Sequence, residues 1–400
     1  MDMSVVCIGS ATVDLYVRAA GATIMEWHTP VARRRYMVLD YGGKMNVPFY
    51  EESVGGGGTN VAVGLLRLGL EASFLGAVGE DAEGERVVAT LQREGVNLSL
   101  LQRIEDERTG CSVILGGDDG ERSVLVYRGA NTRLNAAKVD WDAVFAADAI
   151  HLASLHGGAV ELLPEIERRL KNFKGRFFFN PGGPQIAKGL ASLSGLLSRC
   201  DALFLNRREA EFLTGLAATK RVVDTQRCTL CGTCQAVCPQ NIFVVAGDHI
   251  ETQHEERCVR CGECVRACPV GAILIEPWTH NMRDIFRKLK SYVGGVVVVT
   301  DGAAGVQCYD GERFYALPSF SVRVVDALGA GDGFCAGFEA AILSGGGLED
   351  GLLWGAAVGA LVTQKVGAKA GLPTKEQLLT FIADSGGSRK RVRVFENGTD

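Results

Sequence analysis

Eight cysteines stand in two short runs near the middle of the 400-residue chain. The runs consist of Cys228, Cys231, Cys234 and Cys238, followed by Pro239, and of Cys258, Cys261, Cys264 and Cys268, followed by Pro269. Such clustering within a long chain favours metal binding over a disulfide framework. Three closely spaced thiolates suit the irons of a cubane, whereas a single zinc ion would leave the third cysteine of each run without a use. The spacing therefore predicts iron–sulfur clusters, with a zinc ribbon as the alternative.

The cysteine segment resembles a bacterial ferredoxin with two [4Fe-4S] clusters. In the ferredoxin pattern C-x2-C-x2-C-x3-C-P, the fourth cysteine of each run binds the other cluster. The resemblance thus implies one cluster on Cys228, Cys231, Cys234 and Cys268 and another on Cys258, Cys261, Cys264 and Cys238. The segment has too little apolar material to fold without its metal.

A second candidate for chemistry is the stretch VVDALGAGDGFCAGFEAAIL, in which a carboxylate follows small residues where a helix is expected to begin. Backbone N–H groups of Gly329, Ala330 and Gly331 at a helix N-terminus form a nest that suits an anion such as a transferring phosphoryl group. Asp332, the expected first residue of the helix, would stand beside the developing charge. The alternative is that Asp332 only caps the helix, but a cap does not need three small residues before it.

Four glycines, Gly55 to Gly58, precede an apolar-periodic helix and form a further candidate loop. No Gly-Lys-Ser/Thr follows them, and they are not a GxGxxG in a strand-turn-helix frame, so the loop is neither a P-loop nor a dinucleotide fingerprint. Taken alone, the glycines fit a tight structural turn and a ligand loop equally well. Asp14 adds a charge at the end of the expected first strand, VVCIGSATVDLYV.

Alternating strands and helices must position these residues. From Glu71 onward, short β-rich runs such as RFFFNPG alternate with helical ones, which predicts an α/β fold with a mostly parallel sheet covered on both faces. The alternation stops near Ala217 and resumes with the helix NMRDIFRKLKSY and the strand GGVVVVTDG. The cysteine segment therefore interrupts an α/β domain and does not follow one.

The flanks of the cysteine segment resemble the ribokinase-like sugar kinases, also called the phosphofructokinase-B carbohydrate kinase family. GGGGTNVAVGLLRLGL is similar to the first family signature, and DALGAGDGFCAGF is similar to the second. The other similar motifs are GAVGEDAEG (76–84), NPGG (180–183), NRREAEFLTG (206–215) and TDGAAG (300–305). The resemblance implies a ribokinase-like three-layer sandwich with a β-strand lid, interrupted by an α+β ferredoxin-type domain.

This resemblance implies three parts of the chain. Residues 1–217 would form the first part of the kinase domain, with the lid at about 18–54. Residues 218–279 would form the inserted ferredoxin domain, and residues 280–400 the second part of the kinase domain with a C-terminal tail. In many relatives the lid pairs two protomers, so a homodimer is expected.

The resemblance also implies a role for each motif residue. Asp332 would take the proton of the accepting hydroxyl, and the N–H groups of Gly329 to Gly331 would stabilise the γ-phosphoryl group in flight. The residues expected to hold the acceptor are Asp14, Gly56, Gly57 and Asn60. Those expected at Mg2+ and the nucleotide are Asn206, Glu209, Thr300, Gly302 and Gly305. The implied reaction is ATP- and Mg2+-dependent phosphorylation of a hydroxymethyl group of a sugar or nucleoside.

One departure from the family concerns a monovalent cation. Many members have Asp-Thr before the Gly-Ala-Gly-Asp, where this chain has Asp326 and Ala327. One hydroxyl is therefore missing from the expected K+ site, which Gly367 and Ala368 would help to build.

Composition excludes other classes of function. With a net charge of -5 and a pI near 5.8, the chain lacks the basic footprint of a nucleic-acid-binding protein. No apolar stretch reaches the roughly 20 residues of a membrane span. The N-terminus has no basic n-region and is interrupted by Asp14, so it predicts a core strand and not a signal peptide. A cytoplasmic location is expected.

The insert has three possible roles: electron transfer or docking of a redox protein partner, redox sensing, and structural support. An opposing interpretation makes the whole chain an electron carrier on an inactive kinase scaffold. The intact Asp332, Gly329 to Gly331 and Glu209 argue against that interpretation.

Overall fold

The computed structural model describes residues 3–18, 23–29, 32–117, 122–216, 219–238, 241–253, 263–277, 282–386 and 391–396. The chain divides into two compact units. The larger unit comprises Met1–Ala20, Asn46–Arg207 and Lys290–Asp400, and the smaller unit comprises Gly21–Met45 and Arg208–Leu289.

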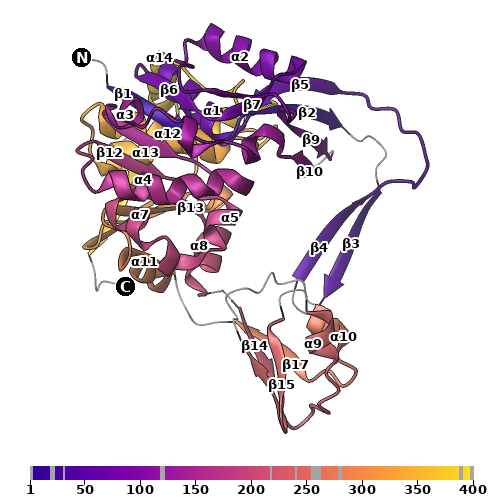
Figure 1. Ribbon diagram of the computed structural model, residues 1–400. Helices are drawn as coiled ribbons and strands as arrows, with labels where there is room; N and C mark the ends of the chain where they lie inside the picture. Colours follow the sequence, from indigo (N-terminus) through magenta and orange to yellow (C-terminus); the bar gives the residue numbers. More distant parts are fainter. Residues whose placement is uncertain are drawn as a thin grey trace. The chain divides into compact units, whose positions relative to one another are not determined.

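A nine-stranded sheet forms the centre of the larger unit (Figure 1). Its strands, in spatial order, are β21 (Arg393–Glu396), β20 (Arg313–Leu317), β19 (Val306–Tyr309), β18 (Val296–Thr300), β13 (Ala202–Asn206), β12 (Arg176–Phe179), β11 (Ala149–Leu152), β1 (Ser4–Ile8) and β6 (Glu71–Leu75). The six strands from β18 to β6 run parallel, and β19, β20 and β21 continue antiparallel. The predicted α/β class with a mostly parallel sheet is confirmed.

Helices cover both faces of this sheet, which explains why its strands are almost wholly apolar. One face packs against α1 (Gly57–Arg67), α2 (Ala82–Glu94), α12 (Ala330–Leu343), α13 (Leu348–Val362) and α14 (Lys375–Asp384). Cys7, Phe178 and Val298 of the strands share one buried core with these helices. The opposite face is covered by shorter helices, among them α4 (Leu163–Leu170) and α7 (Ser194–Arg199).

The remaining elements of the larger unit are short. They are the two-stranded sheet of β7 (Ala77–Gly79) and β8 (Gln102–Ile104), the helices α3 (Trp141–Phe145), α5 (Gly183–Ile186) and α6 (Gly189–Ser192), and the 3-10 turns η1 (Gly129–Thr132), η2 (Ala136–Lys138), η3 (Gly157–Leu162) and η5 (Gly302–Ala304). Within the described ranges, no helix combines the length and hydropathy of a membrane span.

A second sheet of four strands in the larger unit includes β5 (Tyr50–Gly55), which leads into the glycine loop Gly55 to Gly58. Its order is β10 (Arg122–Tyr127), β9 (Gly110–Gly116), β2 (Thr12–Arg18) and β5. The opening run that the sequence predicts as one strand is therefore two strands in two sheets, and Asp14 lies in β2 and not at the end of the first strand. Asn131 stabilises the chain at the point between β1 and β2. Its side chain accepts a hydrogen bond from the N–H of Ala11 (2.8 Å) and donates one to the carbonyl of Ala11 (2.7 Å).

The predicted lid, about residues 18–54, supplies only part of this second sheet. β5 comes from the end of that range, while β9 and β10 come from outside it. The middle of the range forms β3 (Thr23–Thr29) and β4 (Ala32–Val38), which pair with each other as a hairpin in the smaller unit.

The smaller unit contains the described part of the cysteine segment. β14 (Thr219–Val223) pairs antiparallel with β17 (Ile273–Pro277), and β15 (Phe243–Ala246) pairs antiparallel with β16 (His249–Thr252). Two short helices, α9 (Thr233–Val237) and α10 (Glu263–Ala267), contact each other and carry the third cysteine of each run. Helices α8 (Arg207–Thr214) and α11 (Met282–Lys290) complete the elements near its chain boundaries.

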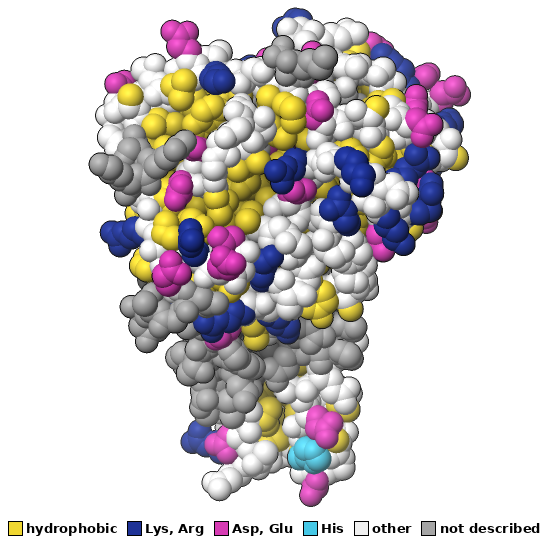
Figure 2. Space-filling model, turned by 90° about the vertical axis from the view of Figure 1, so that its left-hand side faces the viewer, with side chains coloured by type: hydrophobic (Ala, Val, Ile, Leu, Met, Phe, Trp, Pro, Cys, Tyr) yellow, Lys and Arg dark blue, Asp and Glu magenta, His cyan; other side chains and the backbone are white. Residues whose placement is uncertain are grey.

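Charges of both signs are spread over the surface of the molecule. On the face shown in Figure 2, Lys and Arg side chains are interspersed with Asp and Glu, and apolar side chains lie between them.

Candidate active site and iron–sulfur site

The carboxyl ends of the parallel strands bring the predicted site residues of the larger unit to one edge of the sheet. In an open α/β sheet this edge is where ligands bind. Asn206 ends β13 and Thr300 ends β18, and the two residues are direct partners in the register of these strands. Gly9 follows β1 at the same edge and lies against Gly58 of the glycine loop.

The glycines at the junction of β5 and α1 differ in what surrounds them. Gly56 has a φ of 99°, and a Cβ there would lie 2.3 Å from the carbonyl oxygen of Ser10, so the backbone itself requires glycine. A Cβ on Gly57 would instead lie 3.4 Å from Oδ1 of Asp332. Gly56 therefore shapes the turn, and Gly57 faces the candidate base.

Asp332 lies in the first turn of α12, which begins at Ala330 and not at Asp332 as the sequence predicted. Gly329 is the N-cap in a left-handed conformation (φ 76°), and a Cβ there would lie 2.6 Å from Cβ of Ala368. The carboxylate of Asp332 accepts a hydrogen bond from Nδ2 of Asn60 at 2.7 Å. The two signature motifs, 272 positions apart, thus meet through this hydrogen bond.

The surroundings of Asp332 suit both a base and an anion. Gly331 is exposed, and nothing among the described atoms lies within 4 Å of a Cβ built on it. The N–H groups in the first turn of a helix lack helical acceptors and carry the positive end of the helix dipole. Desolvation raises the pKa of Asp332, while the hydrogen bond from Asn60 and the positive charges of His151 and Lys369 oppose the rise.

Asp14 is buried in β2, with 5% of its surface exposed. Its Oδ1 accepts from the hydroxyl of Thr12 at 2.9 Å. A Cβ on Gly55 would lie 1.8 Å from the other oxygen, Oδ2, so the first glycine of the loop makes room for this carboxylate. The negative charge of Asp14 acts on Asp332, which places the two predicted acidic residues in one electrostatic environment.

Lys369 was missed by the sequence reasoning, although its neighbours Gly367 and Ala368 were considered. It is 7% exposed, and burial lowers its pKa to about 7. Its ammonium group donates to the side chains of Asn60 (2.6 Å) and Thr59 (2.7 Å). A lysine between small residues in GAKAG was the only available signal, and it does not distinguish a buried lysine from an exposed one.

A buried pair of titratable side chains lies further along α12. Nδ1 of His151, in β11, is 2.6 Å from Oε1 of Glu339, and both side chains are at most 1% exposed. Within the described structure, His151 Nε2 and Glu339 Oε2 have no hydrogen-bond partner.

The region of the expected K+ site is held by Asp326, which is 2% exposed. Its carboxylate accepts from the N–H of Leu328 (2.9 Å) and of Gly367 (3.0 Å), and Arg122 lies 3.6 Å from it. Asp326 therefore ties the segment before α12 to the segment 367–369 that carries Lys369.

The residues predicted to bind the nucleotide and Mg2+ lie on β13, on β18 and in the segments that follow these strands. Arg207 and Asp301, the residues that follow Asn206 and Thr300, form an ion pair of 2.9 Å between the two strand ends. Gly302 and Gly305 have positive φ values of 52° and 95° in the turn after Thr300. Glu209 lies in the first turn of α8. Among the described residues, no three His, Cys, Asp or Glu side chains form a group suited to one metal ion.

One set of predicted cluster ligands lines a common cavity in the smaller unit. Cys228, Cys231, Cys234 and Cys268 surround it, together with apolar side chains that include Val223, Ile250 and Ile273. These four cysteines are the set that the ferredoxin pattern assigns to one cluster, and they line one cavity, although as they stand their side chains do not converge on a single metal position. In the second set, Cys238 and Cys264 are described, while Cys258 and Cys261 lie outside the described residues.

The fourth cysteine of each run has the same backbone contact. The N–H of Ile242 lies 3.5 Å from Sγ of Cys238, and the N–H of Ala272 lies 3.2 Å from Sγ of Cys268. Hydrogen bonds to sulfur stabilise a cluster ligand and tune its potential. The two halves of the segment thus share local geometry as well as sequence.

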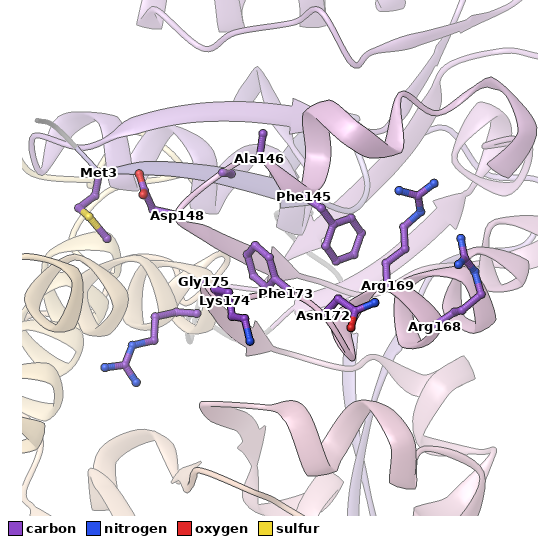
Figure 3. A pocket seen from close by; sticks show the side chains of 12 residues that line it. Met3, Phe145, Ala146, Asp148, Arg168, Arg169, Asn172, Phe173, Lys174 and Gly175 are labelled. Atoms are coloured by element: carbon purple, nitrogen blue, oxygen red, sulfur yellow. The ribbon is translucent and has the colours of Figure 1, made fainter.

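A cavity of about 830 Å³ lies at the opposite, amino-terminal edge of the large sheet (Figure 3). Phe145 and Phe173 meet edge to face within its lining. Its arginines are paired with carboxylates, as in Arg169 with Asp142 (3.0 Å) and Arg176 with Asp201 (2.7 Å). This pairing makes the cavity less suited to an anion than its arginines suggest.

Comparison with known proteins identifies the families to which the two parts of the chain are similar. Residues 3–227 and 278–375 match the pfkB family of carbohydrate kinases, and residues 227–273 match the 4Fe-4S dicluster domain. The ATP-dependent ribose-1-phosphate kinase of Halopiger xanaduensis is 26% identical over 368 residues, which cover 92% of this chain and 99% of the relative. The ribokinase of Haemophilus influenzae is 26% identical over 336 residues, which cover 83% of this chain and 88% of the relative.

Solved structures with the same fold include two kinases. The ribokinase from Thermotoga maritima aligns with a TM-score of 0.64 and 18% identity, covering 96% of this chain and 100% of that one. The nucleoside kinase from Methanocaldococcus jannaschii aligns with a TM-score of 0.64 and 18% identity, covering 96% of this chain and 99% of that one. The predicted ribokinase-like fold is confirmed.

Both family resemblances read from the motifs are likewise confirmed by the matched residues. The chain therefore belongs to the pfkB family of carbohydrate kinases and contains a 4Fe-4S dicluster ferredoxin domain.

Proposed function

We propose that this chain uses ATP and Mg2+ to phosphorylate a hydroxymethyl group of a sugar or nucleoside. The hydrogen bond between Asn60 and Asp332 carries the proposal, because it joins the glycine loop to the start of α12. A base and an anion site then lie within one helical turn of each other. In-line phosphoryl transfer needs this arrangement more than it needs covalent chemistry.

Each predicted residue has a role in this reaction. Asp332 takes the proton of the acceptor hydroxyl, and its raised pKa suits a general base, since efficiency improves as the pKa approaches the working pH. The N–H groups of Gly329, Ala330 and Gly331 receive the phosphoryl group in flight. The acceptor is held by Asp14, Gly56, Gly57 and Asn60.

The nucleotide lies on the side of β13 and β18 in this proposal. Thr300, Gly302 and Gly305 carry its phosphates and ribose, and Asn206 and Glu209 organise Mg2+ and its waters. Mg2+ keeps several waters and binds mainly through substrate phosphates, so a site with few protein ligands suits it. Mg2+ neutralises charge on the phosphates when it is bound. A K+ ion beside Asp326, Gly367 and Ala368 would complete the site.

Relatives narrow the acceptors worth testing. The two curated relatives described above are named for ribose 1-phosphate and for ribose, and one of the two solved structures is named as a nucleoside kinase. We infer an acceptor with a furanose ring, whose hydroxyls Asp14 would bind with its two carboxylate oxygens.

The ferredoxin domain adds a function that phosphoryl transfer does not use. We infer two [4Fe-4S] clusters on the two cysteine sets, supported by the cavity that Cys228, Cys231, Cys234 and Cys268 share. When bound, such clusters can accept and donate single electrons. Because phosphoryl transfer moves no electrons, we assign the clusters to redox sensing or to docking of an electron-transfer partner.

The four-stranded sheet is the proposed dimer contact. β10 is an edge strand whose apolar residues Val124, Leu125, Val126 and Tyr127 are 40% to 61% exposed. An exposed apolar edge strand is a template for pairing with another chain. A homodimer through this sheet would cover it.

A panel of acceptors tests the kinase assignment. Protein purified without oxygen is mixed with ATP, Mg2+ and ribose, ribose 1-phosphate, fructose or a nucleoside, and ADP release is followed. At least one acceptor should raise ADP release well above that of an Asp332→Asn variant. If protein that contains its iron–sulfur clusters releases no more ADP with any acceptor, the alternative of an electron-transfer protein on an inactive kinase scaffold would be favoured. Iron and sulfide analysis of the same sample should give about eight of each per chain.

A further inference from the structure

Lys369 is a buried lysine that lies outside the signature motifs. Its Nζ donates to three acceptors, which are the carbonyl of Val54 (2.9 Å), the hydroxyl of Thr59 (2.7 Å) and Oδ1 of Asn60 (2.6 Å). An ammonium group has three N–H donors and no acceptor, so this site satisfies it fully. The arrangement matches the general requirement that a buried charge be completely hydrogen-bonded.

The ammonium group determines which way the Asn60 amide points. A side-chain amide has an acceptor oxygen on one side and a donor nitrogen on the other. Lys369 donates to Oδ1 of Asn60, which leaves Nδ2 of the same amide facing Asp332. The two contacts, 2.6 Å and 2.7 Å, run in sequence from Lys369 through Asn60 to Asp332.

This orientation affects the two oxygens of Asp332 differently. Oδ2 is occupied by Asn60, while Oδ1 is the oxygen nearest to a Cβ built on Gly57, at 3.4 Å. A substrate hydroxyl beside the glycine loop would therefore meet Oδ1. The absence of a side chain on Gly57 leaves space for that hydroxyl.

Lys369 is itself held in place from several sides. Nη1 of Arg67 donates to the carbonyls of Lys369 (3.1 Å) and Leu372 (2.8 Å), which anchors the backbone of the segment. The negative charges of Asp14, Asp332 and Glu94 favour the ammonium form, whereas burial and Arg67 disfavour it.

We propose that Lys369 is a positioning residue for phosphoryl transfer, which holds the Asn60 amide so that it donates to one oxygen of Asp332 and leaves the other for the acceptor's proton. The inference rests on the proposed role of Asp332 as the base. Lys369 acts through Asn60 and not on the reacting atoms.

The kinetic test uses Lys369→Met, with Lys365→Met as the matched control because Lys365 is exposed in the same segment. We expect kcat to fall about 10- to 100-fold in Lys369→Met, the effect of a small misplacement of a catalytic group, with the KM for ATP changed less than about twofold. Lys365→Met should behave as the unchanged protein. A folded Lys369→Met variant with unchanged kcat would overturn the proposal.

A double-mutant cycle separates positioning from a general structural role. If Lys369 acts through Asn60, the double variant Lys369→Met, Asn60→Ala should be no slower than the slower single variant. Losses that multiply would show two independent roles and contradict the inference. If Lys369→Met does not fold, Lys369→Gln replaces it, since Gln keeps a buried donor without the charge.

Lysine 13Cε NMR provides a readout that needs no turnover. The Lys369 resonance, identified by its loss in Lys369→Gln, should shift in both Asn60→Ala and Asp332→Asn. A resonance unchanged in both variants would refute the chain of contacts. A different outcome is that the resonance shifts but the protein phosphorylates none of the acceptors. That result would refute the proposed function, and with it the catalytic role of Lys369, but it would leave the chain of contacts supported.

Discussion

The two units of the molecule hold their candidate functional residues in different ways. In the larger unit, Asp14, Asn60, Asp332 and Lys369 come from distant parts of the chain and sit on a core formed by strands and five helices. In the smaller unit, the cysteine segment contains a cluster of six buried residues, two of which, Cys234 and Cys264, are predicted cluster ligands.

This difference indicates how far the folding of each unit depends on its bound ligands. The core of the larger unit is made of apolar side chains that take no part in the site, so its site can be complete before substrate arrives. In the smaller unit two predicted ligands are part of the cluster of buried residues, so we expect cluster binding and folding to be one process. The predictions below test this contrast, from the largest expected effect to the smallest.

Removal of iron should abolish the fold of the smaller unit and spare the larger one. After anaerobic chelation, we expect amide protection to be lost in β14 to β17 and to persist in β1, β11 and β12, because only the first group surrounds the cysteines. Hydrogen exchange followed by mass spectrometry measures both at once. Persistent protection of β14 to β17 in iron-free protein would mean that the six-residue core is sufficient by itself.

Asp332→Asn should lower kcat by about 10^2- to 10^4-fold, the usual contribution of a general base. Iron content should not change, because the site belongs to the larger unit. Glu349→Gln is the matched control, since Glu349 is an acidic residue in the first turn of α13, the next helix. Near-normal turnover of folded Asp332→Asn would remove Asp332 from the role of base.

Asp14→Ala should affect the acceptor more than the nucleotide. A hydrogen bond to a charged group contributes about 1.5 to 3 kcal/mol, so kcat/KM for the acceptor should fall about 10- to 150-fold per bond lost. The KM for ATP should change little. Equal losses for both substrates would indicate damage to β2 and its sheet instead of a lost substrate contact.

A smaller effect concerns stability and pH. Since desolvation raises the pKa of Asp332, folding favours the neutral form of this carboxyl group, and the resulting stability is present at low pH and lost as the pH rises through the folded-state pKa. Asparagine is neutral throughout. Asp332→Asn should therefore raise the Tm of the larger unit by about 1 to 3 °C at pH 7.5 and not at pH 4. Thermal denaturation without substrate measures this, and a lower Tm at pH 7.5 would show that the charge stabilises the fold.

Much of the fold was predictable because it depends on local constraints. Strands covered by helices on both faces need continuous apolar runs, such as RFFF in β12 and VVVV in β18, and these runs are visible in the sequence. The cysteine spacing and the glycines around Gly56 and Gly329 were equally visible, since cluster geometry and left-handed backbone restrict residue type at fixed positions. The start of α12 was misplaced by two residues because Asp332 suggested a cap.

The sequence by itself therefore determined the α/β class, the two signatures and the cysteine pattern. Only the tertiary structure decided which charges are buried together. The break between β1 and β2 depends on Asn131, 120 positions away, and Lys369 bonds to partners more than 300 positions away. A charged side chain is stable in the interior only when its hydrogen-bond partners surround it, and partners this distant are brought together by packing and not by any local pattern.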